Sequence, residues 1–386
     1  MKKTLILLAA LLFSTMYTSA RRVVFVTVDG YRWQELFSGA DSLLIGNNEQ
    51  LKANYWKTTA EERRSLLMPF TWSEIARNGL MIGNRWKGCR MQVKNKMQFS
   101  YPGYNELLCG HPDDEQINTN NPVWNPNVSI LEIANNTDRY KGKVLIFASW
   151  DRFIHILNEQ RSHLEINTGY RHSLSPNPTE RERLVEKMQD AAPRFWEHER
   201  ADVFTHEYAI EAMKSRKPEL IYIGYGDIDE LAHMGDYRLY LEGARTFDNF
   251  LKEIWEYIQS DPFYKDQTTL IITCDHGRGC GKVKADDWRD HGTNTTESGE
   301  TWFMAIGKDI PPWERYPVTD SITTIRLQQL LPISCKSLLR PNTHRLERKW
   351  NSNTKTRTDE KDNHGCRTSL HGNIWHASTD AEIQQQ

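Results

Sequence analysis

The stretch RVVFVTVDG, residues 22–30, joins an apolar, β-branched run to an aspartate and a glycine. Three later stretches have a similar form: KVLIFAS at residues 143–149, ELIYIGYGD at 219–227 and TTLIITCDHG at 268–277. Because their hydrophobicity is continuous rather than alternating, they predict strands buried on both faces, as in a parallel sheet covered by helices. TWFMAIG at residues 301–307 offers a further strand.

Helical patterns lie between these strands. Residues 180–215 and residues 237–260 carry apolar side chains at three- and four-residue spacing, which is typical of amphipathic helices. The alternation of strands and helices predicts an α/β fold with a mostly parallel central sheet sandwiched by helices.

The composition suits a globular protein and argues against binding to a charged polymer. The chain has 386 residues, 13 tryptophans and a formal net charge of -2, with no extended basic run. It is therefore long enough to bury a core, but it lacks the electrostatic footprint of a protein that binds nucleic acid. We expect a small-molecule partner and no nucleic acid polymer.

The first twenty residues have the order of a signal peptide. Lys2 and Lys3 precede an apolar run at residues 5–13, and small residues follow up to Ala20. We expect cleavage after Ala20 and export to the periplasm or the medium; an N-terminal membrane anchor or a buried helix is the alternative. The apolar run is too short to span a bilayer and no other segment is apolar enough, so we expect no stable membrane anchor.

The six cysteines would meet an oxidising compartment after export. No CxxC pair occurs among them, which argues against a thiolate zinc site and favours a structural role. Cys89 with Cys109, or Cys274 with Cys280, could form disulfides, and the sequence does not decide the pairing.

The last part of the chain differs in character from the rest. Residues 325–386 are polar and have little periodicity, so we predict a catalytic domain at 21–324 and an irregular tail without a catalytic role. Residues 325–338 can be back-translated so that a shifted frame reads SIAATIANFLQIL, an amphipathic helix. We therefore hypothesise a frameshift near Thr324, which the nucleotide sequence would test.

Acidic residues concentrate where the predicted strands end. Asp29 closes the first strand, Asp227 and Asp229 follow the third, and Asp275 with His276 closes the fourth. A single aspartate there often caps a helix or forms a turn. Because the carboxyl ends of parallel strands meet at one edge and bind ligands there, three such strand ends indicate a site.

The spacing of these residues suits divalent metals. In GDIDELAHMGD, Asp229 and His233 are four apart and would project from one face of a helix, although a capping aspartate and an exposed histidine would look the same. His291 follows in a polar loop. We predict two donor sets, Asp229 with His233 and His291, and Asp29 with Asp275 and His276. Two zinc ions about 4 Å apart could clamp a phosphoryl transfer, and a hydroxyl nucleophile would complete the second set.

Five segments in this order resemble the alkaline phosphatase superfamily, and within it the nucleotide pyrophosphatase/phosphodiesterase-like branch. The resemblance covers most of the chain from Val26 to His291 and rests on VTVDGYRWQELF, FSYPGYNELLCGH, GDIDELAHMGD, CDHGRG and DHGTN. It implies an alkaline phosphatase-like fold and, with the export expected from residues 1–20, an exported two-metal phosphohydrolase that cleaves phosphate mono- or diesters through a phosphoserine intermediate.

The resemblance also implies roles for individual residues. Ser100 would be the nucleophile and would join Asp29, Asp275 and His276 around one metal, while Asp229, His233 and His291 would hold the other. The nitrogen-rich shell favours Zn²⁺ over the alternative, Mn²⁺. From its position alone Ser100 also fits a helix N-cap, and both roles are compatible because a helix N-terminus favours a phosphate charge.

The chain departs from that branch after the proline of the nucleophile turn. Gly103 and Tyr104 stand where the branch often has asparagine and histidine, so its substrate contacts do not transfer. For the asparagine that binds a phosphoryl oxygen we favour Asn120 over Asn118 and Asn121, although a turn residue would fit as well.

Three alternative functions fit the sequence less well. A sulfatase-like hydrolase is disfavoured because the arginine of the C/SxPxR signature is absent after Ser100. A phosphoglycerate mutase-like metalloenzyme would need a large inserted domain, for which the gap between Ser100 and Asp229 is short. A non-catalytic secreted binding protein is disfavoured because every metal position holds a competent ligand.

Overall fold

The computed structural model describes residues 22–280, 284, 286–310 and 322–323. The predicted signal peptide, both domain limits, the tail and the frameshift hypothesis lie outside these residues. The strands are β1 (Arg22–Val28), β2 (Leu80–Ile82), β3 (Met91–Gln92), β4 (Val144–Ala148), β5 (Glu165–Thr168), β6 (Leu220–Tyr225), β7 (Thr268–Cys274), β8 (Glu300–Thr301), β9 (Phe303–Gly307) and β10 (Ile322–Thr323).

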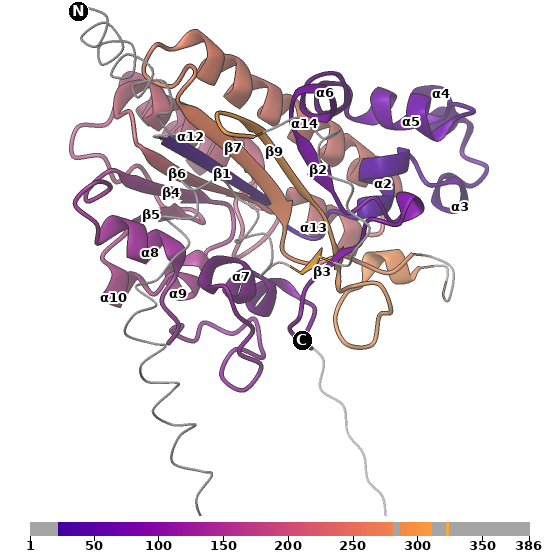
Figure 1. Cartoon of the computed structure of the whole chain (residues 1–386), viewed down its shortest axis with the longest axis horizontal. Helices are drawn as coiled ribbons and strands as arrows, with labels where there is room; N and C mark the ends of the chain where they lie inside the picture. Colours follow the sequence, from indigo (N-terminus) through magenta and orange to yellow (C-terminus); the bar gives the residue numbers. More distant parts are fainter. Residues whose placement is uncertain (1–21, 281–283, 285, 311–321, 324–386) are drawn as a thin grey trace, which may run out of the picture. The chain divides into compact units, whose positions relative to one another are not determined.

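The main sheet has seven strands in the order β2-β9-β7-β1-β6-β4-β5. β1 pairs in parallel with β6 and β7, and β4 pairs in parallel with β5 and β6, whereas β9 runs antiparallel to both β7 and β2. A smaller sheet has the order β10-β3-β8. The predicted α/β fold with a mostly parallel sheet is confirmed (Figure 1).

Residues on alternate sides of each central strand enter different cores. In β1, Val24 and Val26 belong to one hydrophobic cluster, whereas Val23 belongs to the other. Ile223 and Tyr222 of β6 divide in the same way. Both faces are therefore covered, which is why these strands read as continuous apolar runs.

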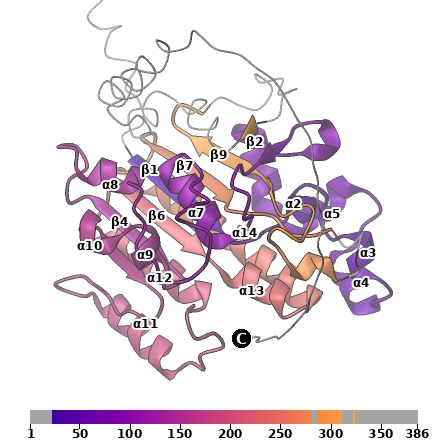
Figure 2. The same ribbon diagram turned by 90° about the horizontal axis from the view of Figure 1, so that it is seen from below.

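The helices form the two outer layers (Figures 1 and 2). They are α2 (Trp33–Ser38), α3 (Ser42–Ile45), α4 (Glu49–Tyr55), α5 (Ala60–Leu67), η1 (Thr71–Ile75), α6 (Ala76–Asn78), η2 (Arg85–Lys87), α7 (Ser100–Cys109), α8 (Ile130–Asn135), α9 (Phe153–Ile156), α10 (Glu159–Ser162), α11 (Glu180–Ala191), α12 (Asp202–Ser215), α13 (Asp227–His233), α14 (Tyr237–Ser260) and η3 (Asp287–Arg289). Side chains of α12 and α14 pack in the first cluster, and those of α7, α8 and α9 pack in the second.

Of the two predicted helical segments, one forms a single helix and the other forms two. Residues 237–260 form α14 over their whole length, with the side chain of Asp236 accepting hydrogen bonds from the first turn. Residues 180–215 instead form two helices, α11 and α12. The break contains Pro193, which cannot donate a backbone hydrogen bond inside a helix.

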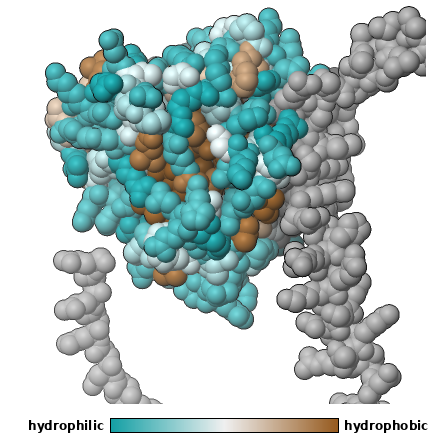
Figure 3. Space-filling model, turned by 90° about the vertical axis from the view of Figure 1, so that its left-hand side faces the viewer, coloured by the Kyte–Doolittle hydropathy of each residue, from teal (hydrophilic) through white to brown (hydrophobic). Residues whose placement is uncertain are grey.

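The surface of the described chain is mostly polar on the face seen in Figure 3, with apolar side chains gathered near its centre. Among the described helices, none combines the length and the hydropathy needed to cross a bilayer. Cys89, Cys109 and Cys274 are free thiols, so neither disulfide considered from the sequence is formed.

Candidate metal centre

The first donor group lies where the adjacent strands β1 and β7 end. Asp29 follows β1, and Asp275 and His276 follow β7, so the parallel pairing brings the three together. His276 Nε2 lies 3.0 Å from Asp29 Oδ1 and 3.6 Å from Asp275 Oδ2. All three side chains are buried, and together they offer ligand atoms close enough to hold one metal ion.

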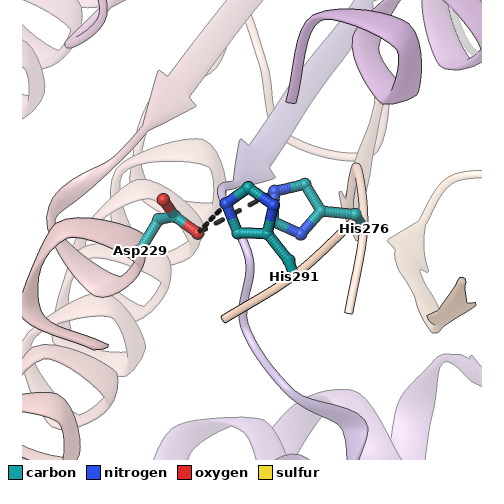
Figure 4. A group of neighbouring side chains, drawn as sticks. All are labelled: Asp229, His276 and His291. Atoms are coloured by element: carbon teal, nitrogen blue, oxygen red, sulfur yellow. Dashed lines mark ion pairs between the residues drawn. The ribbon is translucent and has the colours of Figure 1, made fainter. Parts of the chain in front are cut away.

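The second group is centred on α13, which begins just after β6. Asp229 and His233 lie on one face of this helix, and His233 Nε2 is 3.0 Å from Asp229 Oδ2. His291 approaches from the loop after η3: its Nε2 is 3.1 Å from His233 Nε2 and 3.8 Å from Asp229 Oδ1. His276 Nε2 also lies 3.8 Å from Asp229 Oδ1, so Asp229, His276 and His291 form a further candidate metal group (Figure 4).

Ser100 completes this cluster. It is the first residue of α7, and its Oγ lies 3.4 Å from Asp29 Oδ1 and 3.3 Å from His276 Nε2. The N-cap of α7 is Phe99, so Ser100 is not the capping residue considered from the sequence. Further along α7, the Glu106 carboxylate accepts hydrogen bonds from the backbone amides of Lys94 and Asn95.

A hydrogen bond to the first turn of α7 holds Asn120 next to Ser100. Its Oδ1 accepts a hydrogen bond of 2.9 Å from the backbone amide of Tyr101. Arg152, which follows β4, donates from Nε to the Asn120 carbonyl at 3.2 Å and so restrains this loop from the other side. For Asn118 and Asn121, the described hydrogen bonds stay within residues 114–123.

Two residues that support the cluster were not assigned a role from the sequence. The buried Arg278 contacts the Asp229 carboxylate and His233, and donates to the backbone carbonyls of Trp288 and Arg289, which lead to His291. The sequence CDHGRG does carry a signal for this role of Arg278: a charged residue stands between two glycines at the end of a buried strand.

Asp202 supports the start of α13 from α12. Its carboxylate accepts hydrogen bonds from the backbone amides of Gly226 at 2.7 Å and Asp227 at 3.0 Å, and from the Ser149 hydroxyl at 2.6 Å. Asp227 in turn accepts a hydrogen bond of 3.0 Å from the Asp202 amide. The strand-end acid Asp227 therefore serves to join two helices, whereas Asp229 faces the donor cluster.

The protonation of the cluster reflects burial and crowding. Burial raises the pKa of Asp275 well above its usual range, and burial together with Asp229 raises the pKa of Asp29. Burial also disfavours a charged His276, yet the carboxylates of Asp275 and Asp29 raise its pKa to about 10. Burial opposes ionisation of Asp229, but Arg278 brings the pKa of that carboxyl well below its usual range.

These residues fit divalent metal ions. Three buried carboxylates converge with imidazoles, and such an arrangement is costly unless cations offset the charge. Among the described residues, Asp275 Oδ2 and His291 Nδ1 are buried and have no hydrogen-bond partner. Mixed carboxylate and imidazole donors are a set that zinc accepts.

Comparisons with known proteins agree with this picture. A family model described as the Metalloenzyme superfamily matches residues 195–296, which include Asp229, Asp275, His276 and His291. No curated protein matches the chain. The lipoteichoic acid synthase LtaP from Listeria monocytogenes has a similar structure, with a TM-score of 0.50 and 9% identity over 79% of this chain and 69% of LtaP.

Two further solved structures are similar at lower scores. A protein in the alkaline phosphatase superfamily from Vibrio parahaemolyticus has a TM-score of 0.46 and 12% identity over 82% of this chain and 67% of its own. Murine ectonucleotide pyrophosphatase/phosphodiesterase 5 has a TM-score of 0.48 and 14% identity over 83% of this chain and 95% of its own. The mostly parallel sheet flanked by helices is thus a fold that the chain shares with LtaP, and its residues 195–296 are similar to the Metalloenzyme superfamily.

Proposed function

We propose that the chain is a two-metal hydrolase of phosphate mono- or diesters in which Ser100 is the nucleophile. The observation that carries this proposal is the position of the Ser100 hydroxyl, within 3.4 Å of Asp29 and 3.3 Å of His276 at the start of α7. A serine so placed lies at the edge of the donor cluster, where a nucleophile is expected.

Two divalent ions would be held by Asp29, Asp275, His276 and Ser100, and by Asp229, His233 and His291. When bound, they would lower the pKa of the serine hydroxyl and offset charge on the phosphoryl oxygens. Zinc is our preferred metal and manganese the alternative.

The chain's own groups would direct the reaction. Ser100 Oγ attacks phosphorus in line with the leaving alcohol, so a serine O–P bond forms as the ester bond breaks. The N-terminus of the ten-residue helix α7 favours negative charge on the phosphoryl group. Asn120, fixed beside Tyr101, is placed to orient that group. Water then cleaves the phosphoserine and returns a proton to Ser100.

The family branch and the location are part of the same proposal. The nucleophile turn and the order of the metal motifs favour the nucleotide pyrophosphatase/phosphodiesterase-like branch. The order of residues 1–20 favours export to the periplasm or the medium.

The test replaces the nucleophile and measures metal content and turnover separately. Ser100→Ala should keep its metals by elemental analysis and lose on the order of 10³-fold or more in kcat for p-nitrophenyl phosphate and bis-p-nitrophenyl phosphate. Ser162→Ala removes another buried hydroxyl and should keep activity. Turnover preserved in Ser100→Ala would eliminate the nucleophile assignment, and a metal-loaded wild type without turnover on either ester would favour a binding protein.

A further inference from the structure

A second cavity lies close to the metal centre but does not include it. Its volume is about 390 Å³, and its walls come from α2, α3, α5, η2 and the chain after β7. None of the predicted metal ligands lines it. This volume lies in the range of small-molecule sites, at the size of one ring-sized group rather than a polymer.

The chain path limits the distance between this cavity and the metal centre. Gln34 in its wall is five residues from Asp29, and Cys280 is four residues from His276. Because an extended residue spans at most about 3.6 Å, the Cα of Cys280 lies within about 14 Å of that of His276. The cavity wall therefore begins close to the metal centre.

The cavity wall has an excess of positive charge. Its two carboxylates already have partners: Asp41 pairs with Arg32 at 3.1 Å and Glu61 with Arg64 at 3.8 Å. Within the described residues, no carboxylate pairs with the Arg63 guanidinium, which donates to carbonyls, or with the Lys87 ammonium. The electrostatics of this wall therefore favour an anionic ligand.

Buried amides add a second requirement. Gln34 and Asn84 line the cavity and are only 8% and 6% exposed. Gln34 Oε1 and Asn84 Oδ1 accept no hydrogen bond from the described part of the chain. Because a buried acceptor without a donor is costly, a rotation that turned these amides toward hydroxyl groups in the cavity would be favourable.

An exposed aromatic ring completes the site. Trp86 is 61% exposed and packs on Trp33 with ring centroids 5.0 Å apart, so its flat face is held in place at the rim. A ring with an apolar C–H face can pack on such an indole while its hydroxyl groups point elsewhere. A ligand that combines an anionic charge, hydroxyl groups and an apolar C–H ring face is an acidic sugar.

We propose that this cavity binds a sugar ring that carries a carboxylate or a phosphate, and that it holds the alcohol part of the phosphate ester. The second half of this statement rests on the proposed function, whereas the binding itself does not. Lys87 and Arg63 would face the anion, the amides of Gln34 and Asn84 the hydroxyl groups, and Trp86 the ring.

Binding is measured first, without turnover. Methyl β-D-glucuronide and the neutral methyl β-D-glucoside are titrated calorimetrically into the metal-loaded protein, with the metal centre saturated by inorganic phosphate. We expect the glucuronide to bind at least about tenfold more tightly, and Lys87→Glu to remove this preference. Lys252→Glu, which reverses the charge of a half-exposed side chain of α14 that does not line the cavity, should retain it. Equal affinity for both glycosides, or unchanged glucuronide affinity in Lys87→Glu, would overturn the proposal.

Turnover separates the site from the proposed function. Phosphate release from glucuronic acid 1-phosphate should exceed that from glucose 1-phosphate in kcat/KM, and Lys87→Glu should bring the ratio close to one. Charge-selective binding without any ester hydrolysis would support the cavity and refute the hydrolase. Hydrolysis of p-nitrophenyl phosphate without charge-selective binding would support the hydrolase and refute the cavity.

Discussion

Replacing Gly30 by alanine tests whether the donor cluster has the tight geometry that metal catalysis needs. Gly30 follows Asp29 with φ +57, and a Cβ there would lie 2.3 Å from Asp229 Oδ1, 2.7 Å from Arg278 Nη1 and 3.1 Å from His276 Cε1. Ordinary contact begins near 3.4 Å, so the Asp229 carboxylate would have to move by about 1 Å. The glycine is therefore needed for two reasons, its backbone conformation and the space beside it.

The two reasons predict effects of different size. A left-handed conformation costs a non-glycine residue about 1–2 kcal/mol, so the free energy of unfolding should fall by about that amount. Displacement of a reacting group by about 1 Å can cost on the order of 100-fold in rate. Gly30→Ala should thus remain folded while it loses about 100-fold in kcat/KM and binds metal more weakly.

The assay compares Gly30→Ala with Gly142→Ala. Gly142 has φ +72 and no atom within 4 Å of an added Cβ, so it reproduces the backbone strain without the crowding. Urea unfolding, elemental analysis after dialysis and kcat/KM for p-nitrophenyl phosphate are measured for both variants. If Gly30→Ala retained metal and activity as well as Gly142→Ala does, the inferred crowding around Asp229 would be wrong.

Two further substitutions test the supports of the site. Glu106→Gln should lower the free energy of unfolding by about 1–3 kcal/mol, since it places an amide against the backbone donors of Lys94 and the buried Asn95. An unchanged urea midpoint would contradict this. Asp202→Ala should weaken metal retention, because the amides of Gly226 and Asp227 at the start of α13 lose their acceptor. Metal content equal to that of the wild type after dialysis would show that α13 needs no such support.

The long buried elements could be predicted because their patterns are local. β1 and β7 are apolar on both faces, and α14 repeats apolar residues over 24 positions, so neighbouring residues alone decide the structure. β2 and β3 have three and two residues; β2 is defined by its pairing with β9, and β3 by its pairing with β8 and β10. Such short strands have no period of their own to detect.

Some residues of the candidate site could likewise be predicted from local patterns, and others could not. Asp29, Asp229 and Asp275 could be found because each follows a recognisable strand, and parallel strands end at one edge. Arg278 and Asp202 act through contacts 49 and 24 residues away in the chain, to Asp229 and to Gly226. For Arg278 the only local signal is its position between two glycines at a buried strand end, and for Asp202 nothing local in the sequence distinguishes its contacts from those of a surface charge.

The start of α7 shows how distant residues free the proposed nucleophile. The hydroxyl of a serine at a helix start often accepts a hydrogen bond from a backbone amide of the first turn. In α7 the N-cap is Phe99, whose side chain has no hydrogen-bond acceptor. Asn120 supplies the missing acceptor instead and bonds the amide of Tyr101 at 2.9 Å. The Ser100 hydroxyl is consequently left to Asp29 and His276. Because capping and nucleophilic attack would compete for the same oxygen, assigning the cap to another residue is what allows Ser100 to serve the donor cluster.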